Sequence, residues 1–128
     1  MARNNNFSVT FSMDSGDGAT GFSESSGNKS FTSGSAVKIE GAISTVERQY
    51  STVSFGFPQA DGIYFENRAT SGVITLKLNT DASTTSHTFA VPPSGVIAVR
   101  FDASQTAITF VSVVADSGTL DYVLCLAE

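Results

Sequence analysis

The sequence contains no tryptophan, one cysteine and one histidine among its 128 residues. A single cysteine, Cys125, excludes a disulfide within the chain. No apolar run approaches the roughly 20 residues of a membrane-spanning helix, and none follows the polar N-terminus as a secretory signal would. We therefore expect the chain to be made and to fold in a reducing cytosol. A domain of this length can bury roughly two-thirds of its unfolded surface without a metal or a disulfide.

Charged residues are also scarce. Lys, Arg, Asp and Glu make up 15% of the chain, and the formal net charge is −5. The seven basic residues are scattered along the sequence, which disfavours binding to the phosphates of nucleic acid. Serine and threonine take the place of charge; they suit strands and turns and leave few groups to repel a neighbouring subunit.

Patterns for chemistry are few. His87 and Cys125 are the only candidates for a base and nucleophile pair, and Cys125 lies in an expected strand outside any glycine-rich elbow, so we interpret both as structural. The segment Asp14-Ser15-Gly16-Asp17-Gly18 lacks the third oxygen ligand and the closing glutamate of a calcium loop. We predict that the protein is not an enzyme and has no cofactor or metal.

What the chain does contain is a series of short apolar runs with alternating polarity, separated by turn residues such as Pro92-Pro93-Ser94-Gly95. These predict about nine strands, at residues 7–13, 36–49, 50–57, 63–68, 73–79, 87–91, 96–102, 107–115 and 120–127. We expect the last five to form an antiparallel meander. No segment has a convincing helical period. The expected fold is all-β, a single antiparallel β-sandwich or jelly-roll-like domain over residues 1–128.

Residues 14–35 are rich in glycine and serine and interrupt this pattern. The simplest interpretation is a mobile loop with too little apolar area to order itself. Phe22 and Phe31 argue against it, because they lie almost symmetrically about Gly27-Asn28 and could close a hairpin arm whose rings need a surface. Docking of that arm on its own domain and docking on a neighbour both stay open.

The strand expected at 107–115 is apolar on both faces. Its apolar residues are Ile108, Phe110 and Val114 on one face and Val111 and Val113 on the other. A sandwich strand that faces water on one side should be polar there, so we expect a cover, either from the chain itself or, as we favour, from another subunit. The candidate interface residues are Phe22, Phe31, Val111, Val113, Val123 and Cys125.

Carbohydrate binding is a second functional hypothesis, because many β-sandwiches bind sugars. Such sites stack a sugar ring on an exposed aromatic side chain, most often Trp or Tyr. Tyr50 and Tyr64 are the candidates here. The ten phenylalanines fall mostly at inward positions and are interpreted as core.

Three segments carry a resemblance: VITLKL at 73–78, FAVPPSGVIAV at 89–99 and GTLDYVL at 118–124. They resemble the small all-β virion proteins of tailed bacteriophages, in which a strand of this type precedes a Pro-Gly turn and a short final strand ends the chain. The resemblance implies a capsid decoration (cement) protein or a small tail accessory subunit. Its partners would be further copies of itself, possibly in a trimer, and a larger capsid or tail protein. The acidic balance suits the outer surface of a particle.

Overall fold

The computed structural model describes residues 3–8, 10–13, 22–27, 29–33, 36–56, 58–82, 85–102 and 107–128. For residues 3–7, 10–13, 22–24, 29–33, 85 and 86 it describes the backbone alone. Within these ranges, no helix is long and apolar enough to cross a membrane.

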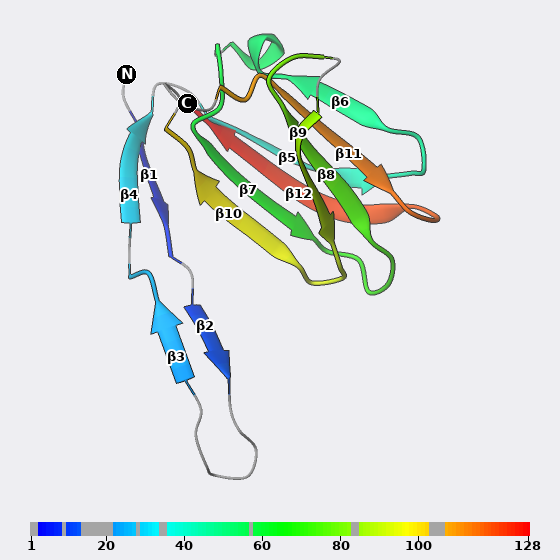
Figure 1. Ribbon diagram of the computed structural model, residues 1–128, viewed down its shortest axis with the longest axis horizontal. Helices are drawn as coiled ribbons and strands as arrows, with labels where there is room; N and C mark the ends of the chain where they lie inside the picture. The colour runs from blue at the N-terminus through cyan, green and yellow to red at the C-terminus, as the bar shows by residue number, and fades with distance from the viewer. Residues whose placement is uncertain are drawn as a thin grey trace.

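Two four-stranded antiparallel sheets pack face to face and form the body of the molecule (Figure 1). The first sheet has the order β10-β7-β12-β5 and the second has the order β6-β11-β8-β9. The strands are β5 (Ala36–Ile43), β6 (Arg48–Ser51), β7 (Gly62–Asn67), β8 (Ile74–Asn79), β9 (Thr85–Val91), β10 (Val96–Arg100), β11 (Phe110–Ala115) and β12 (Leu120–Ala127). The prediction of an all-β sandwich is confirmed.

The strand order identifies the sandwich as a jelly roll. The first of the eight strands pairs with the last (β5 with β12), the second with the seventh (β6 with β11), the third with the sixth (β7 with β10) and the fourth with the fifth (β8 with β9). This is the order of one long antiparallel ribbon that has been wound into two sheets. The expected meander is therefore wrong: of these eight strands, only β8 and β9 are neighbours both in sequence and in a sheet, because the later connections cross between the sheets.

Alternation along the strands places the core as the sequence predicts in most of the body. Ile74, Leu76 and Leu78 of β8 are fully buried between the sheets. The core-facing side of β12, in the opposite sheet, contributes Leu120, Tyr122, Leu124 and Leu126, each at most 8% exposed. Ile97, Val99 and Phe101 are half-buried and pack against this core from the β10 edge.

The sandwich has eight strands where the sequence predicts nine, because the first expected strand belongs to the arm. A second difference concerns residues 50–57: the strand ends at Ser51 and continues as the 3₁₀ helix η1 (Thr52–Phe55). Gly56 ends this helix in the left-handed region (φ 91°), where its N–H binds the carbonyls of η1. Val53 is consequently 70% exposed and does not join an inward face.

A two-stranded ribbon precedes the sandwich and extends away from it (Figure 1). Each side of the ribbon consists of two short strands. One side has β1 (Arg3–Phe7) and β2 (Thr10–Met13), and the other has β3 (Phe22–Ser25) and β4 (Lys29–Ser33). We call it the arm. β1 pairs with β4, and β2 pairs with β3.

The arm is a hairpin, but not the one that the sequence predicts. A turn at Gly27-Asn28 would pair the segments of Phe22 and Phe31 with each other, whereas the register sets Phe22 opposite Met13 and Phe31 opposite Asn5. Gly27, with φ 64°, instead joins β3 to β4 on the same side of the ribbon. The Ser-rich segment pairs instead with residues 3–7 through β4 and with residues 10–13 through β3. Residues 14–21 lie outside the described residues.

Candidate functional site

The outer face of the β10-β7-β12-β5 sheet carries a group of charged side chains that pair with one another. Lys38 and Glu40 occupy alternate positions on β5, and Tyr64 and Glu66 do so on β7, with Arg68 following β7. β12 lies between them and sets Val123 directly opposite both Glu40 and Glu66. We call this surface the charged face.

Ion pairs run across the charged face from β5 to β7. Lys38 Nζ lies 2.9 Å from Glu40 Oε1, and Arg68 Nη1 lies 3.5 Å from the same oxygen. Arg68 Nε is 3.4 Å from Glu66 Oε2, which also accepts a hydrogen bond of 2.9 Å from the Tyr64 hydroxyl. The hydrogen bond and charge of Lys38 lower the pKa of the Glu40 carboxyl, with Arg68 adding to the effect. Glu40 is therefore an anion throughout the neutral range.

This network covers the apolar positions that the sequence assigns to an interface. Val123 points away from the core but is only 2% exposed, because the side chains paired with it across β12 close over it. Cys125 is half-buried between Lys38 and Tyr64. Burial raises the pKa of the Cys125 thiol, so the thiol stays protonated at neutral pH. Val123 needs no second subunit to exclude water.

The other predicted interface residues lie elsewhere. Val111 and Val113 are fully buried in the core between the sheets, so their expected place on an outer face is wrong. The register of β11 turns Phe110 and Val114 outward instead, and both are half-buried. The misassignment arises because both faces of this strand are apolar, so the sequence pattern does not reveal which face points toward the core. The backbones of Phe22 and Phe31 lie in β3 and β4 of the arm.

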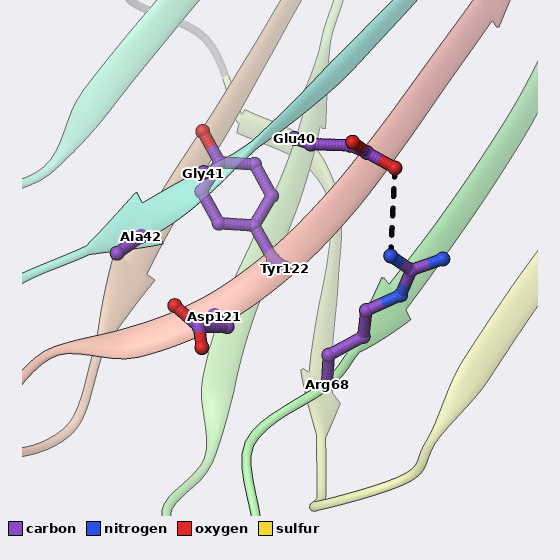
Figure 2. Close-up of a pocket in the computed structure, with 6 residues that line it drawn as sticks. All are labelled: Glu40, Gly41, Ala42, Arg68, Asp121 and Tyr122. Carbon is purple, nitrogen blue, oxygen red and sulfur yellow. Dashed lines mark hydrogen bonds and ion pairs between the residues drawn. The ribbon is translucent and has the colours of Figure 1, made fainter.

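A shallow hollow of about 540 Å³ opens at the β5–β12 end of the charged face (Figure 2). It is lined by Glu40, Gly41, Ala42, Arg68, Asp121 and Tyr122. Figure 2 shows the Arg68 guanidinium directed at Glu40 from the neighbouring β7 side. Gly41 leaves the floor open, since a methyl group built there would meet nothing within 4 Å. The hollow offers one guanidinium and two carboxylates to a polar ligand.

The two tyrosines proposed as sugar platforms differ in their surroundings. Tyr50 packs against the core, and its hydroxyl lies 2.5 Å from that of Tyr122, so its ring is not a free platform. Tyr64 is 36% exposed on the charged face. Burial and the Glu66 carboxylate raise the pKa of Tyr64.

The groups considered for catalysis and metal binding are not brought together. His87 is exposed on β9 of one sheet, whereas Cys125 lies on β12 of the other. Residues 14–18, weighed as a calcium loop, lie outside the described residues. Among the residues that are described, no group of three or more His, Cys, Asp or Glu side chains is placed to bind a metal ion.

Sequence reasoning missed the charged face as a unit. Alternating charges at Lys38–Glu40 and a Tyr-x-Glu at 64–66 were visible signals for outward faces, but which strand lies between them depends on pairing. The chain matches no protein-family model and no curated protein.

Proposed function

We propose that this protein is a non-enzymatic structural subunit of a tailed-phage virion, most specifically a decoration protein on the outer surface of the capsid. The observation that carries the proposal is the combination of a self-sufficient jelly roll with an arm that extends from it. Jelly rolls build many viral shells. A shared fold by itself is only an analogy, so the proposal depends mainly on the arm.

The arm supports an assembly role on energetic grounds. An isolated two-stranded hairpin is marginally stable at best in water, because it buries too little apolar surface to offset its ordering. The sandwich needs no help from the arm, since its core is closed by its own eight strands. An arm of this kind is therefore stabilised most when it packs on the surface of a neighbouring molecule, where it can bury more apolar area.

The charge distribution supports the outer surface of the capsid over its lumen. The net charge is −5, and the basic residues Lys38 and Arg68 are already paired with carboxylates. A lumenal subunit would face packaged DNA, which repels a negative protein.

Electron microscopy of particles tests the proposal. Particles from the encoding virus should carry the chain as density on the outer capsid surface, and a deletion of its gene should remove that density and leave the shell. Density on the tail would assign the tail accessory role instead. Particles whose composition lacks the chain would contradict the virion proposal altogether.

A second function, glycan or receptor binding, is favoured by one observation: Tyr64 is exposed on the charged face and is linked through Glu66 and Arg68 to the hollow. An aromatic ring beside fixed polar groups is the usual arrangement for a sugar. Glycan-array binding that is lost in Tyr64→Ala and retained in the matched Tyr50→Phe variant would support this function. Equal binding by both variants would argue against it.

A further inference from the structure

β9 forms an edge of the second sheet whose outer side has no partner among the described strands. β9 pairs with β8 on one side, and no described strand pairs with its other side. Phe89 stands opposite Leu76 across the β8–β9 pair and therefore faces the core side of the sheet. Leu76 is fully buried, whereas Phe89 is 38% exposed. The sandwich's own strands therefore close the core, but the outer side of Phe89 at this edge is left open to solvent.

β9 also lacks the features that usually keep a sheet edge from pairing. Edge strands are commonly protected by charged side chains, by proline, by shortness or by bulges. β5 carries Lys38 and Glu40, and β6 has only four residues, including Arg48. β9 contains no Lys, Arg, Asp, Glu or Pro. Its one irregularity lies opposite Leu78 and Asn79, which leaves residues 87–91 in regular pairing.

The arm supplies a strand of matching length and pattern. β4 has five residues, Lys-Ser-Phe-Thr-Ser, with Phe31 at the centre. The regular stretch of β9 is His-Thr-Phe-Ala-Val, with Phe89 at its centre. β4 pairs with β1 on one side only, so its other side can join a second sheet. An antiparallel alignment that pairs Phe31 with Phe89 leaves only Lys29 as a charged residue, opposite Val91 at the end.

We propose that β4 of one copy adds to the free side of β9 of a second copy, which extends that sheet to β6-β11-β8-β9 followed by β4 and β1 of the neighbour. Main-chain hydrogen bonds supply affinity in such strand addition, and side chains at alternate positions supply specificity. The Phe31–Phe89 pair covers the exposed edge of the core, and aromatic cross-strand pairs are favourable.

The acceptor is a second copy because the arm leads away from its own sandwich (Figure 1). The inference deepens the proposed function by naming one partner and its contact.

Disulfide trapping tests the register. In a Cys125→Ser background, Thr32→Cys and Thr88→Cys fall opposite each other in the proposed pairing. Mild oxidation should give covalent dimers and larger species in this variant, and at least tenfold less in a matched control with Thr32→Cys and Thr119→Cys, since Thr119 is exposed on the β11–β12 turn. Equal trapping in both variants overturns the inference. So does a crosslink confined within one chain.

A charge at the edge provides an independent test in the otherwise unaltered chain. Phe89→Lys should raise the dissociation constant of the oligomer at least tenfold by sedimentation, whereas Val96→Lys, also at an exposed apolar position on an edge strand, should leave it unchanged. Circular dichroism and thermal melting verify that both variants fold. A monomeric wild-type chain, or equal effects of the two variants, overturns the inference.

The two proposals fail in different ways. Particles that carry the chain on their surface, together with an absence of specific trapping, would leave the virion role standing and remove β9 as the acceptor. Specific trapping in solution, together with particles that lack the chain, would support the strand addition and remove the virion role.

Discussion

The hydroxyl oxygens of Tyr50 and Tyr122 lie 2.5 Å apart across the space between the two sheets. Tyr50 belongs to β6 of one sheet and Tyr122 to β12 of the other, so this hydrogen bond joins the layers at the β5–β6 side of the sandwich. Arg48 stands beside the pair, and its hydrogen bond to Tyr50 raises the Arg48 pKa. Tyr122 is 1% exposed and its ring stacks on Phe65, with centroids 5.9 Å apart.

The first prediction concerns alkaline pH. Burial, followed by the hydrogen bond to Tyr50, raises the pKa of Tyr122 from 10.0 to about 12. A raised pKa in the folded state favours the neutral phenol, so its contribution is complete below pH 10 and is lost as the pH rises from 10 to 12. The denaturation midpoint of the wild type should fall over this window by more than that of Tyr122→Phe. An identical decline in Tyr122→Phe would contradict the assignment.

The second prediction concerns Asn67, which is fully buried. Its side-chain NH₂ donates to the carbonyls of Gly72 (3.1 Å) and Val91 (2.9 Å), and its Oδ1 accepts the N–H of Ala69 (3.0 Å). Asn67→Ala leaves these groups unpaired and should cost about 2–3 kcal/mol of unfolding free energy. Asn67→Asp should cost at least as much, because a carboxylate has no N–H to donate. Ser71→Ala, at an exposed position in the same loop, should change stability little by urea denaturation.

The third prediction compares two glycines with positive φ, Gly72 at 93° and Gly118 at 65°. A Cβ on Gly72 would lie 2.8 Å from Leu120 Cδ1, whereas a Cβ on Gly118 would meet nothing within 4 Å. Gly118→Ala should cost about 1 kcal/mol for the left-handed backbone alone. Gly72→Ala should cost more, because the methyl group also displaces Leu120. Thermal melting should therefore give a lower midpoint for Gly72→Ala than for Gly118→Ala. The opposite order would contradict the close packing of Leu120 against Gly72.

The fourth prediction separates the two faces of β11. Val111 is fully buried between the sheets and Val114 is half-buried on the outside. Val111→Ala should lower the unfolding free energy by about 2–3 kcal/mol, since it opens a cavity in a close-packed core. Val114→Ala should lower it by less than about 1 kcal/mol. If chemical denaturation gives equal losses of unfolding free energy for the two variants, the outer face of β11 is covered as fully as the inner one.

Much of the fold could be predicted from the sequence because strand alternation is local. A period of two along β8 and β12 marks Ile74, Leu76, Leu124 and Leu126 as inward residues whatever the strands pair with. The same logic placed Tyr64 outward on β7. It failed on β11, where both faces are apolar, and at residues 52–55, where the chain coils into η1 with alternating residues still present.

The amino-acid sequence by itself determined the all-β class, the inward faces of most strands and the scarcity of charge and of cysteine. Only the tertiary structure decided that β12 lies between β5 and β7, that Glu40 and Arg68 therefore meet over Val123, and that β9 is left at an edge with Phe89 half exposed. The physical reason is sequence separation. Side-chain alternation is encoded within a few neighbouring residues, whereas pairing can join distant segments: the partners in β5 and β12 range from Ile43 with Leu120 to Ala36 with Ala127. Such pairing depends on the packing free energy of the whole sandwich.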